Sequence, residues 1–566
     1  MMIAMMVLAS ALTVADRAAS GEVEVVGIPW SFPSNRIDWL FNPTERKGPF
    51  NPEWTWQLNR MYFWKDMAEA YRTTKDEKYA RAFAMQLGDW LDQTGGAPAE
   101  EGYNGCGSPW RTIEEGLRLM DAWPIAYDAF AASPSFAPKL KERFVASMRA
   151  QANHLVKHRS AGSNWLLIEM TGIYSFACRF PDFPESGTLR RTAAGTVCRA
   201  LKEQQLPDGM HDELSSDYFV VFYMTAERVY RLARQHGYVA ELPRDFGDML
   251  ERGAEATLDM MLPGFVQPSF NDSWNTPSHE VLGRASDLFP NRRDFLWGAT
   301  EGRKGKPPAG GRTASRFLPY AGFAAMRTDW SRNASCLVFD VGPLGQAHAH
   351  QDKLGFALWK GDEQLVFDDG GGQYDDSAQR RYALTAYDHN TLLVDGLAQR
   401  RKGPLKVAAP IEAGWKTTAA GDVAYGVYDQ GFGDSMLKLA VQKRTVAFDR
   451  RKDVFTVTDE VRSADGNAHV YELLFHVDST NVAVSADATV ATVDYGAGRR
   501  WKLELKAGGG TITTASGQLN PRLSGWYVGR IGTKASYRVA TTISVKAAKA
   551  VPDHTFVTTL KPVRRK

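Results

Sequence analysis

The sequence predicts two domains of different class, a helical domain of successive helix pairs followed by an antiparallel β-sandwich. The hydrophobic period is helical from about residue 50 to 300. A stretch rich in glycine, proline and basic residues follows at 302–316, which is typical of a linker. After it, short segments rich in β-branched and aromatic residues alternate with turn residues. A chain of 566 residues also exceeds what one core usually supports, so two or three domains are expected.

Residues 1–21 open with a short apolar run that contains the small residues Ala9 and Ala11, as secretory signals do. No Lys or Arg precedes the run, so an atypical or truncated signal and a disordered start both remain open. We expect this segment to lie outside the folded domains and the protein to be periplasmic or secreted. No later run reaches the roughly 18 apolar residues of a bilayer span, so no membrane span is expected.

The helical domain is predicted over 22–315. Its first two helices share the turn residue Thr74 and the N-cap residue Asp76, and further helices are expected at 111–131, 137–158, 186–205, 217–236 and 245–262. The apolar faces of the first pair consist of Leu58, Met61, Trp64, Ala68 and Tyr71, and of Tyr79, Phe83, Leu87, Trp90 and Leu91. Because each pair lacks a complete core, the pairs must stack, as a solenoid or as an α/α toroid.

The β-sandwich is predicted over 316–566, from many short strands at regular spacing. The formal charge of +3 does not indicate nucleic-acid binding, although a polyanionic ligand would need a local basic cleft. Four cysteines without a C-x-x-C motif indicate neither a disulfide framework nor a cysteine metal site; unpaired core cysteines are expected, with a single bridge as the alternative.

Histidines gather at the start of the β domain. The segment QAHAHQDK carries His348 and His350, LVFDDGGG carries Asp368, and YDHNTLLVDG carries His389. If 346–352 is a strand, His348 and His350 point to the same face. Only 11 histidines occur in the chain, so this clustering beside a carboxylate and glycines indicates a site rather than a solvated polar face.

Two motifs of the helical half complete the pattern. AGSNWLLIEMTGIYS places Asn164 at a helix start, and LPDGMHDELSSDYF places Tyr218 after a Pro-Asp-Gly turn. Together with NPEWTWQLNR at 51–60 and WRTIEEGLR at 110–118, the chain resembles the heparinase II/III superfamily of polysaccharide lyases. The resemblance covers about 39–396 and implies that the helices form an incomplete (α/α)n toroid.

The resemblance also implies roles for individual residues. Asn164 matches the asparagine that contacts the uronate carboxylate, Tyr218 the catalytic tyrosine and His348 the catalytic histidine. Alginate lyases of this superfamily carry a histidine directly after the asparagine, whereas this chain has Trp165. That departure removes one group that would neutralise the carboxylate, so Arg60 or Arg111 is expected to help. His211 is a further candidate for substrate binding.

His350, Asp368 and His389 match residues that hold a divalent metal in some relatives. Two imidazoles and a carboxylate suit zinc or manganese, and we expect a structural role for the ion. The alternative is a hydrogen-bonded network without metal. Asn164 as a helix cap and Tyr218 as a core residue are the corresponding structural alternatives at the catalytic positions.

The resemblance implies β-elimination of an anionic polysaccharide that contains uronic acid, most readily a glycosaminoglycan such as heparan sulfate, chondroitin sulfate or hyaluronan. The alternatives are an alginate or other polyuronate lyase, a glycoside hydrolase and a non-catalytic polysaccharide-binding protein. A hydrolase would need two carboxylates flanking the bond, for which Glu169, Asp212, Glu213 and Asp272 are available. The sequence does not predict the oligomeric state.

Overall fold

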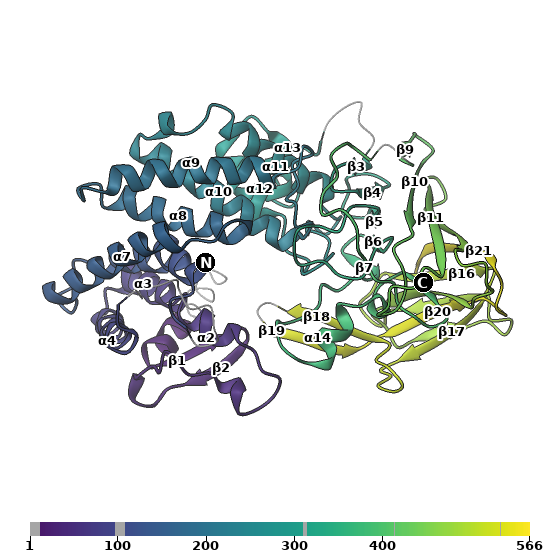
Figure 1. The fold of residues 1–566 in the computed structure, drawn as a ribbon, viewed down its shortest axis with the longest axis horizontal. Coiled ribbons are helices and arrows are strands. Elements are labelled where there is room, and N and C mark those ends of the chain that lie inside the picture. Colours follow the sequence, from purple (N-terminus) through teal and green to yellow (C-terminus); the bar gives the residue numbers. More distant parts are fainter. Residues whose placement is uncertain (1–11, 97–107, 309–313, 412–413, 532–533, 566) are drawn as a thin grey trace.

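The computed structural model describes residues 12–96, 108–308, 314–411, 414–531 and 534–565. Helices gather in one half of the molecule and strands in the other (Figure 1), so the predicted fold class is confirmed. The helices of the first half are α2 (Glu53–Leu58), α3 (Phe63–Thr74), α4 (Glu77–Thr94), α5 (Thr112–Met120), α6 (Ala122–Phe130), α7 (Pro138–His158), α8 (Ser163–Arg179), α9 (Ser186–Gln204), α10 (Ser216–His236), α11 (Phe246–Met260), α12 (His279–Leu288) and α13 (Arg293–Ala299).

The first helix pair, α3 and α4, packs through its predicted apolar faces. Trp64 and Phe83 are fully buried and meet edge to face, with ring centroids 5.0 Å apart. Asp76 caps α4, because its carboxylate accepts a hydrogen bond from the backbone N–H of Lys78 at 2.9 Å. The side-chain period and the cap therefore act together to set this hairpin.

The prediction of one helix over 111–131 was wrong. α5 and α6 are separate helices that meet at Asp121, whose backbone leaves the helical region with φ −129° and ψ −87°. The carboxylate of Asp121 accepts a hydrogen bond from Nζ of Lys65 at 2.7 Å. Pro124 then falls in the first turn of α6, where its missing N–H costs nothing. The apolar pattern of the two helices is continuous, but this proline marked the break.

The segment 1–21 divides at the start of the described residues. Its first 11 residues lie outside them, whereas 12–19 form a helix in which Ala15 and Ala18 are buried. The carbonyl of Ala18 accepts a hydrogen bond from Gln86 of α4 at 2.9 Å. The described end of this segment is therefore part of the packed helical half. Among the described residues, none of the helices is long and apolar enough to cross a membrane.

The described residues of the β half form three antiparallel sheets and a hairpin. One sheet has the order β3 (Arg316–Leu318), β4 (Phe323–Arg327), β5 (Ser335–Asp340), β6 (Phe356–Lys360), β7 (Glu363–Val366). An eight-stranded sheet runs β14 (Val482–Val484), β15 (Val490–Asp494), β16 (Trp501–Gly508), β21 (Asp553–Arg564), β12 (Val454–Ser463), β11 (Ala440–Asp449), β10 (Gly421–Tyr428), β9 (Lys416–Thr417).

The third sheet has the order β17 (Thr511–Ser516), β20 (Thr541–Lys546), β13 (Tyr471–Val477), β8 (Leu392–Val394), and the hairpin consists of β18 (Trp526–Ile531) and β19 (Lys534–Val539). Phe339, Phe448 and Phe475, one from each sheet, belong to one fully enclosed apolar core. The sheets therefore form a sandwich around shared side chains. Cys178, Cys198 and Cys336 are buried and unpaired, as expected, and Cys106 lies outside the described residues.

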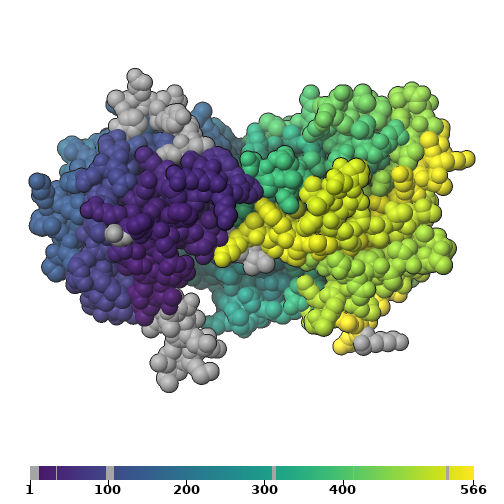
Figure 2. All heavy atoms as spheres, turned by 90° about the horizontal axis from the view of Figure 1, so that it is seen from below, coloured from purple at the N-terminus to yellow at the C-terminus, as the bar shows by residue number. Residues whose placement is uncertain are grey.

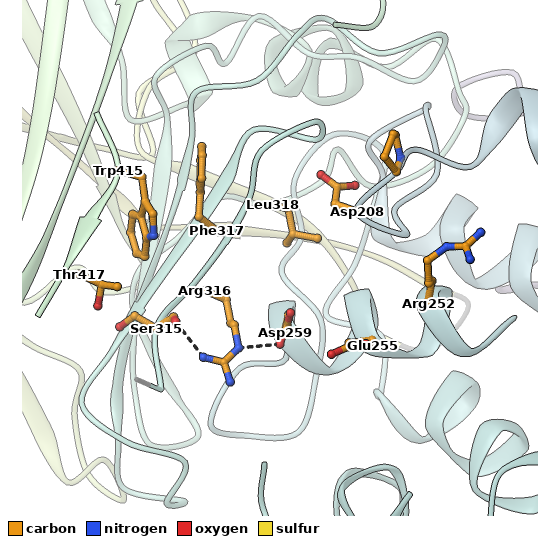
Figure 3. Close-up of a pocket in the computed structure, with 11 residues that line it drawn as sticks. Asp208, Arg252, Glu255, Asp259, Ser315, Arg316, Phe317, Leu318, Trp415 and Thr417 are labelled. Atoms are coloured by element: carbon orange, nitrogen blue, oxygen red, sulfur yellow. Dashed lines mark hydrogen bonds and ion pairs between the residues drawn. The ribbon is translucent and has the colours of Figure 1, made fainter. Parts of the chain in front are cut away.

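The two halves are joined by polar contacts on one side. Nε of Arg316 on β3 donates to the carboxylate of Asp259 on α11 at 2.9 Å, beside a cavity of about 590 Å³ (Figure 3). The carboxylate of Asp208 accepts hydrogen bonds from the backbone N–H groups of Tyr320 and Ala321 at 2.7 and 2.9 Å. These bonds hold the helical half against the first sheet.

On the other side, the β half reaches the N-terminal hairpin of β1 (Glu22–Val25) and β2 (Ile28–Ser31). Figure 2 shows the yellow C-terminal region in contact with the purple N-terminal region. Lys534 of β19 lies 3.9 Å from the carboxylate of Glu24, and the side chain of Gln373 donates to the carbonyl of Val26 at 3.1 Å. The space between the halves is therefore bounded from both domains.

Candidate active site

A cavity of about 480 Å³ lies between the halves, where the N-terminal turns of three helices approach one another. Arg111 immediately precedes α5, Asn164 stands in the first turn of α8 and Tyr218 in the first turn of α10, and all three line the cavity. Tyr374 and Arg530 line it from the β half. Helix N-termini carry partial positive charge, so this arrangement favours an anionic ligand.

Glu213 joins two of the predicted catalytic residues. Its carboxylate accepts hydrogen bonds from Nδ2 of Asn164, at 3.0 and 3.2 Å, and lies 3.0 Å from Nδ1 of His348. Burial raises the pKa of Glu213, but the hydrogen bond from His348, the neighbouring imidazole of His211 and the bond from Asn164 together leave the pKa below its ordinary value. An ionised Glu213 therefore fixes both side chains, and Asn164 does not act as a helix cap.

Tyr218 stacks on His348, with ring centroids 3.5 Å apart and planes 17° from parallel. Its hydroxyl lies 2.8 Å from that of Tyr374, whose own hydroxyl donates to Asp272 at 3.1 Å. Burial raises the pKa of Tyr218, so the phenol is protonated at neutral pH in this state. Tyr218 and His348 thus form a compact pair with a hydroxyl and an imidazole side by side.

Asp272 anchors the end of this chain of hydroxyl groups. It accepts from Nε2 of His350 at 3.0 Å and from Arg380 at 2.6 Å. Burial raises the pKa of Asp272, but these two cationic or donor partners outweigh burial and hold it well below its ordinary value. The carboxylate is therefore an ionised acceptor that orients Tyr374 toward Tyr218.

The predicted strand at 346–352 is absent, and that prediction was wrong. His348 and His350 lie in the loop between β5 and β6, and His348 has a left-handed backbone with φ 61°. They point to different partners, Glu213 and Asp272. A non-glycine residue in this backbone region is uncommon and is typically retained where tertiary contacts require it.

The two candidate arginines line the cavity but already have carboxylate partners. Arg60 lies 2.9 Å from Glu114 and 3.3 Å from Glu53. Arg111 lies 2.5 Å from Glu114 and 3.5 Å from Glu53, and its guanidinium sits 3.6 Å from the ring centroid of Trp56. The positive charges of the two arginines are thus balanced by the two glutamates. Trp165 also lines the cavity, and its ring centroid lies 5.1 Å from the guanidinium of Arg111.

His211, the third candidate for substrate binding, is fully buried. Its ring stacks on Phe222 with centroids 4.6 Å apart, and Nε2 lies 3.2 Å from Oε1 of Gln204. Burial lowers its pKa, so it is neutral at physiological pH. His211 therefore does not line the cavity.

His350, Asp368 and His389 meet in the β half. Nδ1 of His389 lies 3.0 Å from Oδ2 of Asp368, and the rings of His350 and His389 have centroids 5.3 Å apart. Three buried atoms of the trio have no hydrogen-bond partner, namely Nδ1 of His350, Nε2 of His389 and Oδ1 of Asp368. Within the described ranges, no three Cys, His or acidic side chains are arranged so that they could hold a metal ion. Unsatisfied buried donors and acceptors are costly, so these atoms fit a group that would satisfy them.

Comparison with known proteins identifies the family. The model of the heparinase II/III N-terminus matches 11–297, and that of the heparinase II/III-like C-terminal region matches 310–554. The chain belongs to the heparinase II/III family.

Similar proteins include two heparin-sulfate lyases. That of Pedobacter heparinus is 30% identical over 326 residues, or 57% of this chain and 48% of the relative. That of Bacteroides stercoris is 26% identical over 379 residues, which are 63% of this chain and 56% of the relative. The chain thus spans about half the length of these relatives.

Two solved structures share the heparinase II/III fold with this chain. Heparinase III has a TM-score of 0.81 at 18% identity and covers 98% of this chain and 85% of that chain. The heparan sulfate lyase HepC of Pedobacter heparinus has a TM-score of 0.65 at 23% identity, covering 98% and 83%. At these identities the likeness concerns the fold.

The sequence did not predict the roles of three residues at this site. Glu213 and Asp272 entered only as possible hydrolase carboxylates, and Arg530 not at all. Glu213 stands five residues before Tyr218 in the same motif, which was a usable signal. Asp272 and Arg530 lie in segments without a motif. Only the fold brings Asp272 against Tyr374 and Arg530 to the cavity.

Proposed function

We propose that this protein is a polysaccharide lyase that cleaves a uronate-containing glycosaminoglycan by β-elimination and leaves an unsaturated uronate end. The observation that carries the proposal is that Tyr218, which lines the cavity together with Asn164, stacks on His348. The family and its heparin-sulfate lyase members support it.

The first requirement of the reaction is neutralisation of the uronate carboxylate, because loss of the C5 proton places further negative charge next to it. An amide NH2 has two hydrogens, so Asn164 can keep one on Glu213 and donate the other to the carboxylate. A preorganised donor of this kind contributes about 3 kcal/mol to transition-state stabilisation. Arg111 and Arg60 also line the cavity, but Glu114 and Glu53 balance their charges.

The second requirement is a base for the C5 proton and an acid for the glycosidic oxygen at C4. Nδ1 of His348 is engaged by Glu213, which leaves Nε2 for proton transfer. The raised pKa of Tyr218 keeps its proton available for the leaving oxygen. When the C5 hydrogen and the leaving oxygen at C4 lie on the same side of the sugar, as in glucuronate, Tyr218 can serve both steps once positive charge favours its phenolate. When these two atoms lie on opposite sides, as in iduronate, the acid and the base must be separate residues, and His348 and Tyr218 fill these two roles.

For substrate, we propose heparan sulfate or a related glycosaminoglycan ahead of alginate. The similarity to two heparin-sulfate lyases supports this choice, as does Trp165 at the position where alginate lyases of the superfamily carry histidine. A periplasmic or secreted location belongs to the same proposal, because a long anionic polymer does not cross a bilayer unaided.

We also propose that His350, Asp368 and His389 bind one divalent ion, zinc or manganese, in a structural role. The three unpartnered buried atoms of these residues support it. When bound, the ion would supply positive charge that cross-links the loops on which the trio lies. The proton-transfer steps above use only the organic side chains of the chain.

A glycoside hydrolase is a weaker reading of the cavity. Its general acid needs a carboxyl that stays protonated near neutral pH. Glu213 and Asp272 instead have lowered pKa values and are occupied by histidine, asparagine and arginine. Burial raises the pKa of Asp212 and of Glu169, but neither residue lines the cavity, and Asp212 is paired with Lys406.

The deciding experiment is a panel of heparan sulfate, chondroitin sulfate, hyaluronan and alginate incubated with purified protein. β-Elimination is followed by the near-ultraviolet absorbance of the unsaturated product, and reducing ends are counted in parallel. We expect both signals to rise together on heparan sulfate. New reducing ends without absorbance would indicate hydrolysis, and neither signal on any polymer would contradict the lyase proposal.

A further inference from the structure

The positive charge of the cavity is distributed unevenly. Arg60 and Arg111 sit within ion-pair distance of Glu53 and Glu114, so the two charges of each sign cancel. A polyanionic saccharide that enters the cavity would therefore meet little net attraction from this pair. A further cation is needed to bind a sulfate or carboxylate that lies at a distance from the reacting sugar.

Arg530 meets this need. It stands on β18 and lines the cavity from the β half, with its guanidinium 4.4 Å from the ring centroid of Trp274. Its Nε is buried and has no hydrogen-bond partner. In the part of the chain that the structure describes, no carboxylate oxygen lies within 4.0 Å of this guanidinium. Arg530 thus differs from Arg60 and Arg111, which share two glutamates.

The acidic neighbour of Arg530 does not neutralise it by contact. Asp217 lies close enough to attract the guanidinium electrostatically, yet its carboxylate accepts the hydroxyl of Thr276. A half-buried guanidinium with an unused N–H is costly unless a partner arrives. The planar fork of arginine matches the two oxygens of a carboxylate or sulfate, and stacking on an indole leaves the edge of the fork free.

The backbone around Arg530 is held in place. The N–H of Val528, two residues earlier on β18, donates to the carboxylate of Asp369. Lys534 on the partner strand approaches Glu24 of the N-terminal hairpin at 3.9 Å. Arg530 is also near enough to Tyr218 and Tyr374 for mutual electrostatic influence. The guanidinium is therefore positioned beside the tyrosines of the proposed reaction.

We propose that Arg530 binds an oxyanion of the saccharide, a sulfate or a second carboxylate, and thereby determines which polymers the cavity accepts. This inference rests on the proposed lyase function for its substrate class. Arg530 is a specificity-determining residue here; the proton transfers remain with Tyr218 and His348.

The test compares the wild type with Arg530→Gln, Arg530→Lys and the control Arg462→Gln, which removes the charge of an exposed arginine on β12. Substrates are heparan sulfate and the same preparation after chemical desulfation and N-acetylation. We expect Arg530→Gln to raise KM at least about tenfold while kcat changes less, as for a lost charge-assisted hydrogen bond. The KM of Arg530→Lys should lie between those of the wild type and Arg530→Gln, and the KM of Arg462→Gln should match that of the wild type.

The two sources of the oxyanion give different results. A KM increase confined to the sulfated polymer identifies a sulfate, and an equal increase on both polymers identifies a carboxylate. Unchanged KM on both polymers in Arg530→Gln overturns the inference and leaves the lyase function intact. Should Arg530→Gln melt well below the wild type, the same comparison is made with Arg530→Lys, for which a KM equal to that of the wild type on both polymers counts against the inference.

Binding separates this inference from the function on which it rests. The affinity of both polymers is measured for Tyr218→Phe and for Tyr218→Phe with Arg530→Gln, by calorimetry without turnover. If the wild type eliminates nothing but the second substitution weakens binding, the lyase proposal fails and the role of Arg530 stands. Equal affinities of the two variants refute the role, and absence of binding by both refutes both proposals.

Discussion

At the scale of single residues, the site depends on carboxylates that hold other side chains. Glu213 connects Asn164 to His348, and Asp272 connects His350 to Tyr374. Each is ionised and buried, so each stabilises one orientation of its partners. The reacting groups are thus positioned by residues that need not touch the substrate.

Tyr218→Phe and His348→Ala should each reduce elimination at least about a hundredfold while the protein stays folded, because each removes one proton-transfer group. Turnover on heparan sulfate and the melting temperature are measured together. Near wild-type turnover in Tyr218→Phe would remove this tyrosine from the mechanism.

Asn164→Ala should lower kcat more than it raises KM, because the amide is needed most when charge develops next to the carboxylate. Steady-state kinetics on the same polymer measure this split. A change in KM alone would instead identify Asn164 as a residue for ground-state binding.

Asp217 makes the stability depend on pH. Burial raises its pKa to about 6, so its protonated form stabilises the fold at low pH and this stability is lost as pH rises toward 6 and beyond. Asp217→Asn should therefore be more stable than the wild type at pH 7.5, by up to about 3 kcal/mol, with a much smaller difference near pH 4.

Denaturant unfolding at the two pH values checks this prediction. Asp182→Asn, which changes an exposed carboxylate, serves as the control. A stability difference for Asp217→Asn that is the same at both pH values would contradict it.

At the scale of helices, the site depends on how closely α5 and α8 approach. A Cβ atom at Gly172 of α8 would lie 2.6 Å from the carbonyl oxygen of Gly116 on α5. The two glycines permit this contact because they have no side chain. The N-terminal ends of the same helices carry Arg111 and Asn164 into the cavity.

Gly172→Ala should destabilise the protein by about 1–3 kcal/mol, because the methyl group forces two backbones apart. The matched control is Gly195→Ala in α9, where an added Cβ meets nothing within 4 Å and should stabilise by up to about 1 kcal/mol. Denaturant unfolding of both variants measures the difference. Equal effects of the two substitutions would show that the α5–α8 contact is not tight.

At the scale of the whole molecule, neither half contains the complete site. The helical half supplies Asn164 and Tyr218, and the β half supplies His348, Tyr374 and Arg530. Contacts at Asp259 on one side and at Glu24 on the other bring the halves together. Interdomain packing therefore assembles the proposed chemistry.

Metal removal tests the proposed ion of the β half. Chelation should lower the melting temperature, because binding by loops distant in sequence stabilises the folded state by mass action. Activity should fall with it, as the loop that carries His350 also carries His348. Elemental analysis of protein purified without chelator is the direct measurement. A protein without zinc, manganese or a similar ion, and with a melting temperature insensitive to chelator, would retain the trio as a hydrogen-bonded network.

The sequence by itself determined the fold class and the order of the main motifs. Helical and strand periods are local properties, so the change of period near 300 was visible without a structure. The motifs around Asn164 and Tyr218 each combine a helix start with its candidate residue, and both residues line one cavity.

Only the tertiary structure decided how these residues meet. His348 and Glu213 are 135 positions apart, and their contact depends on how the two domains pack. Asn164 and Glu213 are 49 positions apart and meet only through packing within the helical half. The backbone of His348 is left-handed rather than extended, and its loop turns His350 toward Asp272 instead of the same face. Arg530 reaches the cavity through a hairpin near the end of the chain. Periodicity describes one element at a time, whereas charge pairing and burial depend on neighbours that only the fold supplies.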